Sequence, residues 1–204
     1  MYFFKEKTRD LVNNEQIFSQ LEQFVSLIEQ KNKVMNLTGF TQDQLWKEGI
    51  YESIITLKQS IYLKNKKIAL LDVGAGAGFP SIPFFIINSD IKLVIVEKLK
   101  KRCDFLQLVK QELNLDFEII NDLASNLQAK FDYITARAVG NLDFLFKITK
   151  KLQNPTTTSL WIKGPKIWDE VLEHKKVLKN YNYSIEEVKS DLDKQIFILK
   201  ANKK

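Results

Sequence analysis

The stretch Leu71-Asp72-Val73-Gly74-Ala75-Gly76-Ala77-Gly78-Phe79-Pro80 decides the fold of this chain of 204 residues. Three of the seven glycines of the sequence fall within five residues here, between two apolar runs. Glycine permits positive φ and lets a ligand approach the backbone, and the first turn of a following helix presents unpaired N–H groups. Pro80 and Pro83 suit that first turn, where a missing N–H costs little. The stretch predicts a strand, a loop and a helix that bind a nucleotide-like ligand.

Short apolar runs alternate with longer helical patterns after Lys67, which is typical of a parallel sheet built from βαβ units. Strands are expected at residues 68–72, 92–97, 117–120, 133–136 and 159–162, and helices at residues 80–87, 100–113, 142–151 and 168–180. Residues 183–188 and 195–199 predict a closing β-hairpin with a polar turn at residues 191–193. The expected fold class is α/β, with a mostly parallel, Rossmann-like sheet that ends in a C-terminal antiparallel hairpin.

An N-terminal helical extension is expected before this sheet. Apolar residues recur at helical spacing between residues 15 and 33, which predicts an amphipathic helix; they are Ile17, Leu21, Phe24, Val25 and Ile28. Residues 45–63 predict one or two further helices. We therefore divide the chain into a helical extension, residues 1–63, and a ligand-binding domain, residues 64–204.

Composition limits the classes of function. With 45% hydrophobic residues the chain can bury one good-sized core. No run approaches the ~18 apolar residues of a membrane-spanning helix, and the N-terminus lacks the apolar core of a signal peptide, so a cytoplasmic protein without a membrane partner is expected. A monomer is expected. The net charge of +6 favours an anionic partner such as nucleic acid, although a lysine-rich codon bias would give the same charge.

The scarcity of cysteine and histidine excludes other chemistries. Cys103 is the single cysteine and His174 the single histidine, which argues against a disulfide and a Cys/His zinc site, and we expect no metal. His174 lies in a lysine-rich run that reads as a solvated helix face, which argues against hydrolase chemistry.

The spacing of the glycines and two acidic residues selects the ligand. The loop reads G-x-G-x-G, whereas a dinucleotide loop reads G-x-G-x-x-G. Asp72 precedes the loop and would repel a pyrophosphate, but it suits the cationic ammonium and sulfonium of S-adenosyl-L-methionine. Glu97 ends the second predicted strand, where an acid can accept both ribose hydroxyls; the alternative is an exposed strand-end glutamate. The cofactor is therefore expected to be S-adenosyl-L-methionine, on the sheet usual for class I methyltransferases.

Five segments together resemble one bacterial family, the glucose-inhibited division protein B family of 16S ribosomal RNA guanine-N7 methyltransferases. In order, they are Asn36-Leu37-Thr38, the glycine stretch continued through Pro83, Glu97-Lys98-Leu99-Lys100-Lys101-Arg102-Cys103-Asp104-Phe105-Leu106, Ala136-Arg137-Ala138-Val139 and Lys163-Gly164. The match covers nearly the whole chain. It implies methyl transfer to 16S ribosomal RNA or the small ribosomal subunit.

The resemblance also implies residue roles. The cofactor residues are expected to be Asp72, Gly74, Ala75, Gly76, Gly78, Phe79, Pro80 and Glu97, with Leu123 and Ala124 in the turn that would hold the adenine. The substrate residues are expected to be Arg102, Arg137, Lys163 and Lys166, of which Arg137 and Lys163 would serve catalysis. Composition also singles out Arg102 and Arg137, because only three of the 31 basic residues are arginine.

The chain departs from the family pattern at several places. Gly49 and Glu52 replace the His and Asp of His-x-x-Asp-Ser, and Leu123 and Ser125 replace the Arg and Glu of Arg-x-Glu. Ala136 stands where the family has Ser before the arginine, and Ser81 stands where it has Gly. These departures concern mainly the substrate side and the adenine turn.

The expected mechanism needs no general base. Guanine N7 has an in-plane lone pair and loses no proton on methylation, which fits a chain with one histidine. Arg137 would hydrogen-bond guanine O6 or a phosphate; the alternative is a structural arginine between strand and helix. Two other functions stay open, a methyltransferase of small molecules or proteins and a noncatalytic RNA- or nucleotide-binding module.

Overall fold

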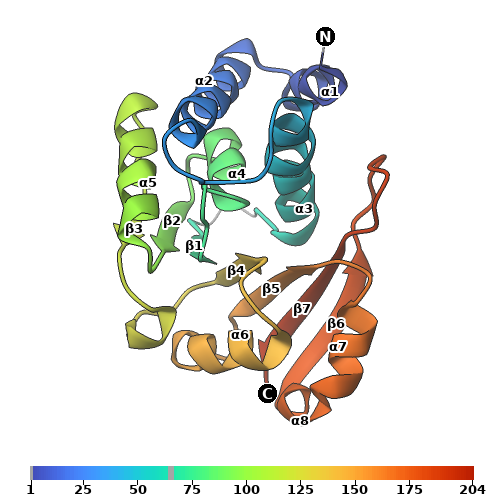
Figure 1. The fold of residues 1–204 in the computed structure, drawn as a ribbon. Helices are drawn as coiled ribbons and strands as arrows, with labels where there is room; N and C mark the ends of the chain where they lie inside the picture. The colour runs from blue at the N-terminus through green and yellow to red at the C-terminus, as the bar shows by residue number, and fades with distance from the viewer. Residues whose placement is uncertain (1, 64–66) are drawn as a thin grey trace.

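The computed structural model describes residues 2–63 and 67–204, and one sheet runs through its centre (Figure 1). Its strands are β1 (Ala69–Val73), β2 (Lys92–Val96), β3 (Glu118–Ile120), β4 (Tyr133–Arg137), β5 (Thr158–Lys163), β6 (Tyr181–Glu187) and β7 (Phe197–Lys203). They are ordered β3-β2-β1-β4-β5-β7-β6. The strands β1 to β5 pair in parallel, and β7 is antiparallel to both β5 and β6. This confirms the predicted α/β fold with its C-terminal antiparallel hairpin.

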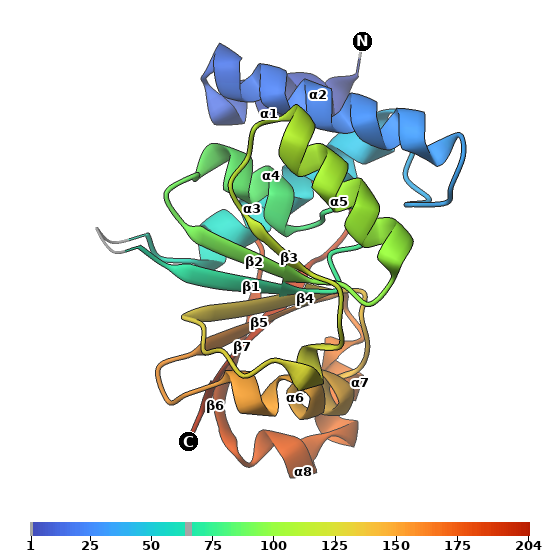
Figure 2. The same ribbon diagram turned by 90° about the vertical axis from the view of Figure 1, so that its left-hand side faces the viewer.

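Helices cover both faces of the sheet (Figure 2). One face carries α1 (Phe3–Val12), α2 (Glu15–Asn32), the π-helix η1 (Leu45–Tyr51), α3 (Glu52–Ser60), α4 (Ser81–Ile87) and α5 (Lys100–Glu112). The other face carries α6 (Leu142–Thr149), α7 (Ile167–Glu173) and α8 (Lys175–Leu178). Two short 3-10 helices lie in the connections, η2 (Ala124–Asn126) between β3 and β4 and η3 (Lys150–Leu152) between α6 and β5. Among the described residues, none of the helices has the length and apolar character needed to cross a membrane.

The N-terminal helices share one hydrophobic core with the sheet. Phe18, Leu21 and Phe24 of α2 are at most 1% exposed and belong to the same cluster as Leu70 and Leu93 of the strands. The apolar stripe predicted for residues 15–33 is therefore the buried face of α2. The division into residues 1–63 and 64–204 stays a prediction, because its boundary touches residues 64–66, which lie outside the described part of the chain.

Two helical predictions differ from the structure. Residues 3–12 form α1, for which no helix was expected; it buries Phe4 and Thr8 and packs Leu11 and Val12 against the core. The single helix predicted for residues 168–180 is wrong, because the chain bends at His174 and forms α7 and α8. Each of these two helices buries one residue, Ile167 or Leu178, so little packing holds them in one straight helix.

Candidate active site

The glycine loop follows β1 at the carboxyl edge of the sheet. The strand order reverses between β1 and β4, which is where open α/β sheets bind ligands. Gly74 and Gly76 have φ of 71° and 60°, so the loop uses the left-handed backbone that glycine permits. A Cβ on Gly74 would lie 2.9 Å from Cγ2 of Val139, a close approach that also excludes a side chain. Pro80 follows Phe79 through a cis peptide, and α4 begins at Ser81, one residue later than predicted.

Asp72 is fully buried directly below the loop. Its Oδ2 accepts a 3.3 Å hydrogen bond from the Ser81 backbone N–H. Its Oδ1 is buried and makes no hydrogen bond of normal geometry within the described residues, although the Ser81 side chain is near enough to lower the pKa somewhat. Burial dominates and raises the pKa of Asp72 to about 7. Oδ1 is thus a free acceptor among the described residues, and the charge of Arg137 opposes the rise in pKa without forming an ion pair there.

Glu97 lies at the end of β2, 2% exposed, and is tied to the glycine loop. Its Oε2 accepts a 3.2 Å hydrogen bond from the Gly76 N–H, and its Oε1 accepts one of 2.9 Å from Leu99 N–H. Arg102 Nη1 lies 3.8 Å from Oε2 and also faces Gly76. The structure therefore places Arg102, predicted as a substrate residue, beside the predicted cofactor residues, with about a third of its side chain exposed.

The turn after β3 lies next to Glu97. The Asn121 side chain donates hydrogen bonds of 3.0 and 3.1 Å to the carbonyls of Glu97 and Lys98, which joins the two strand ends. In this turn Ala124 is buried, whereas Leu123 is 52% exposed. Leu99, 45% exposed, presents a second apolar side chain after β2. Sequence reasoning missed Leu99; its signal is an apolar residue within a basic run.

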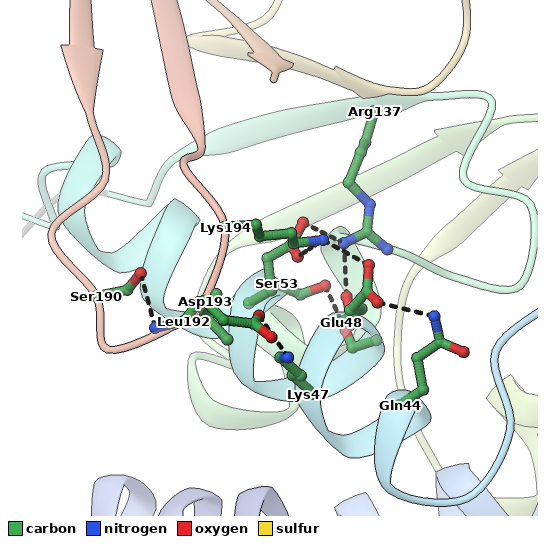
Figure 3. A network of polar contacts seen from close by, with 11 residues as sticks. Gln44, Lys47, Glu48, Ser53, Arg137, Ser190, Leu192, Asp193 and Lys194 are labelled. Carbon is green, nitrogen blue, oxygen red and sulfur yellow. Dashed lines mark hydrogen bonds and ion pairs between the residues drawn. The ribbon is translucent and has the colours of Figure 1, made fainter. Parts of the chain in front are cut away.

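Arg137 ends β4 and is held by the N-terminal helices (Figure 3). Its Nη1 donates to the Glu48 carbonyl at 2.8 Å and to Glu52 Oε1 at 3.2 Å, and its guanidinium carbon lies 5.3 Å from the centre of the Phe79 ring. Burial lowers the pKa of Arg137, and the nearby charges of Glu52 and Asp72 oppose that shift. An arginine remains cationic at any pH that the fold tolerates.

Lys163 ends β5 and joins two loops. Its Nζ donates to the Gly140 carbonyl at 2.7 Å and to Glu170 Oε1 at 3.0 Å, and its side chain is 12% exposed. Lys166, immediately before α7, is exposed. The ammonium of Lys163 is therefore partly engaged by the protein, whereas that of Lys166 faces solvent.

A cavity of about 590 Å³ lies at the carboxyl ends of β4 and β5. Of the four expected substrate residues, Arg137 and Lys163 line it together, whereas Arg102 and Lys166 do not line it. Its other charged lining residues are Glu52 and Lys194. The remainder of its wall is Phe40, Ala138, Gly140, Ile162, Gly164, Pro165, Gln195 and Ile196.

Lys194 and Glu52 were not predicted as site residues. The Lys194 ammonium lies 2.5 Å from Glu48 Oε2 and 2.6 Å from Glu52 Oε2 (Figure 3). Burial favours the neutral amine of Lys194, but the hydrogen bonds and charges of both glutamates outweigh it and raise the pKa. Glu52 stands at the Asp position of the His-x-x-Asp-Ser pattern, but no motif marks Lys194, and these contacts join positions more than 130 residues apart in sequence.

Solved structures of methyltransferases share this fold. M. jannaschii TYW2, solved in complex with AdoMet, superimposes with a TM-score of 0.56 over 76% of this chain and 77% of that chain at 15% identity. The mitomycin 7-O-methyltransferase MmcR gives a TM-score of 0.61 over 79% of this chain and 56% of that chain at 11% identity. At such identities the likeness concerns the fold, which is the Rossmann-like fold of class I methyltransferases.

Sequence comparison narrows the class to one family. The GidB family model, described as rRNA small subunit methyltransferase G, matches residues 17–197. Ribosomal RNA small subunit methyltransferase G of Mesomycoplasma hyopneumoniae strain J is 50% identical over 186 residues, 89% of this chain and 90% of that protein. The proteins of the same name from Mycoplasma mobile and Streptococcus pneumoniae serotype 19F are 43% and 34% identical over 97% and 83% of this chain, and over 89% and 75% of their own lengths. The chain therefore belongs to the GidB family of methyltransferases, which confirms the resemblance found in its motifs.

Proposed function

We propose that this protein transfers a methyl group from S-adenosyl-L-methionine to N7 of a guanosine in 16S ribosomal RNA. The observation that carries the proposal is the junction of two sites at one sheet edge. The glycine loop follows β1 and is joined to Glu97 at the end of β2, and a cavity with three cationic side chains follows β4 and β5. Membership of the GidB family and the names of the relatives support the RNA substrate.

The described residues fit the cofactor. Asp72 offers a buried oxygen without a hydrogen bond of normal geometry, which suits an ammonium donor, and a bound cation would favour the ionised carboxylate. Glu97 keeps lone pairs for ribose hydroxyls, since each oxygen accepts one backbone hydrogen bond and a carboxylate has about four acceptor positions. Leu99 and Leu123 offer apolar surface for the adenine. When bound, S-adenosyl-L-methionine supplies an electrophilic methyl group.

The substrate side requires binding and orientation. Arg137 presents N–H donors to guanine O6 or a phosphate, and Lys163 and Lys194 add positive charge to the same cavity. No residue has to remove a proton, because N7 attacks with its own lone pair. The protein would thus contribute proximity, alignment and charge stabilisation.

The partner and the place of action follow from this substrate. Lys166 and the exposed part of Arg102 would meet RNA phosphates at the rim of the site. The net charge of +6 favours such contacts. We infer action in the cytoplasm on 16S RNA or the small subunit, as a monomer.

The test is methyl transfer from labelled S-adenosyl-L-methionine to three acceptors, namely 16S RNA, small ribosomal subunits and a protein and metabolite extract. Label in the RNA of either of the first two acceptors supports the proposal. Label confined to the extract would instead indicate a methyltransferase of small molecules or proteins. Calorimetry that detects no S-adenosyl-L-methionine binding would indicate a noncatalytic module.

A further inference from the structure

Arg137 reaches the cavity from β4, but the groups that hold it belong to the N-terminal helices. The Glu48 carbonyl and Glu52 Oε1 both accept from the same nitrogen, Nη1, at 2.8 and 3.2 Å. The Phe79 ring lies against the guanidinium. Side-chain exposure is 14% for Arg137 and 6% for Glu52, so the pair is screened little by water.

The guanidinium is a rigid planar group with five N–H donors. Anchoring one nitrogen on two acceptors fixes the direction of the remaining donors. Arg137 and Glu52 both line the cavity, so this anchoring takes place at its wall. Among the described residues that line the cavity, Glu52 is the only acidic one.

Lys194 keeps the cluster electrically balanced. Two cations, Arg137 and Lys194, are paired with two acids, Glu48 and Glu52. Without Glu52, the buried guanidinium of Arg137 would keep only the Glu48 carbonyl of its two hydrogen-bond acceptors. A buried charge that loses its partner shifts towards water or towards another acceptor.

From these contacts we infer that Glu52 is a positioning residue for methyl transfer: it orients the Arg137 guanidinium in the substrate cavity. The inference rests on the proposed function, in which Arg137 contacts the RNA. It makes the N-terminal extension part of the substrate site, because Glu52 lies on α3.

A competing explanation is that Glu52 only attaches the β6–β7 hairpin to the extension. The same hairpin tip makes other such contacts, since Asp191 accepts a 2.9 Å hydrogen bond from Tyr51 and pairs with Lys7. Asp191 does not line the cavity and does not contact Arg137. The substitution D191N therefore serves as the control for a lost hairpin contact.

The experiment measures kcat and KM for methylation of 16S RNA by the wild type, E52Q, E52D and D191N. We expect E52Q to lower kcat by roughly 10- to 100-fold, since misplacement of a positioning group by about 1 Å has effects of that size. E52D restores part of the loss because it keeps the charge. S-adenosyl-L-methionine affinity in E52Q and kcat in D191N stay within about twofold of the wild type.

A double-mutant cycle with R137K distinguishes positioning of Arg137 by Glu52 from attachment of the β6–β7 hairpin by Glu52. Because Glu52 acts through Arg137, E52Q lowers kcat less in R137K than in the wild type. The inference would be overturned if E52Q lowered kcat by the same factor in R137K as in the wild type. It would also be overturned if E52Q and D191N had equal kcat values while the wild type methylated 16S RNA. Wild-type protein that leaves 16S RNA unmethylated would overturn the proposed function together with it. If circular dichroism shows that E52Q is unfolded, E52D takes its place in the cycle.

Discussion

Asp72 combines complete burial with a carboxyl oxygen that lacks a hydrogen bond of normal geometry in the described structure. Its pKa is raised by burial from 3.8 to about 7, so the folded protein binds this proton more tightly than the unfolded chain does. The contribution of Asp72 to the free energy of unfolding is therefore full below pH 3.8, falls as the pH rises to about 7 and is constant above that. The ionised form of Asp72 therefore destabilises the folded protein above pH 7, and we assign this residue to the cofactor site.

The substitution D72N is expected to stabilise the protein and to impair it. Removing the buried charge raises the free energy of unfolding at pH 8 by about 1–3 kcal/mol, whereas the gain at pH 5 is smaller. Urea denaturation at the two pH values measures the difference, and calorimetry measures S-adenosyl-L-methionine binding, which should weaken at least tenfold. Equal stability gains at both pH values would mean that Asp72 does not titrate as described.

Glu97 is the second acid of the cofactor site. Substitution of Glu97 by Gln removes the negative charge and replaces one of the two side-chain oxygens that accept backbone hydrogen bonds. We expect S-adenosyl-L-methionine affinity to fall by roughly 10- to 100-fold, the range of a lost charged hydrogen bond. Isothermal titration calorimetry provides the measurement. The exposed Glu118, at the start of β3, is the control, and E118Q should bind as the wild type does. An E97Q variant with unchanged affinity would remove Glu97 from the site.

Among the elements, α2 shares a hydrophobic core with the strands of the sheet. Phe24 is fully buried, and its ring centre lies 5.7 Å from that of Phe79. Its Cζ would lie 3.1 Å from a Cβ placed on Gly78, so the ring packs against the glycine loop. We expect F24A to lower the free energy of unfolding by about 3–5 kcal/mol in a single transition. The 61% exposed Phe3 is the control, and F3A should cost under about 1 kcal/mol. Chemical denaturation followed by circular dichroism and tryptophan fluorescence tests this, and two separate transitions would show that α2 folds independently.

The elements themselves were largely predictable from the sequence. Apolar runs predicted all seven strands, with boundaries displaced by at most one residue in the parallel part and by up to four residues in the hairpin, where β7 runs to Lys203. The loop at Gly74 was predictable because a local backbone requirement selects glycine. The helix α1 was not predicted, although its apolar side chains gather on one face, and the bend at His174 was not predictable because α7 and α8 each bury a single residue.

The substrate cavity was less predictable than the glycine loop for a physical reason. Arg137 and Lys163 are recognisable as strand ends, and parallel strand ends meet at one edge. Glu52 and Lys194 reach the cavity through packing of the extension and the hairpin on the sheet, and no sequence period encodes that contact. Contacts of this kind become visible when the whole chain is folded.

At the scale of the whole molecule, the net charge of +6 predicts salt-sensitive RNA binding. Lys98 and Lys101 are exposed beside Glu97, and Lys175 and Lys176 are exposed on α8, across the sheet. We expect the double substitution K98Q/K101Q to reduce the slope of log K against log salt by about 1–2, and K175Q/K176Q to leave it unchanged. Filter binding to 16S RNA between 50 and 200 mM salt, the span over which phosphate contacts lose most affinity, measures both slopes. Equal slopes for the two variants would place the RNA elsewhere.

The position of the transferred methyl group decides whether this protein methylates guanine N7. Small-subunit RNA methylated by the protein is treated with borohydride and aniline, which cleave the chain at N7-methylguanosine, and the fragments are mapped. We expect one new cleavage at a guanosine of 16S RNA, absent without S-adenosyl-L-methionine and strongly reduced with E52Q. Methylated RNA that resists cleavage, or a label found outside RNA, would contradict the proposed function.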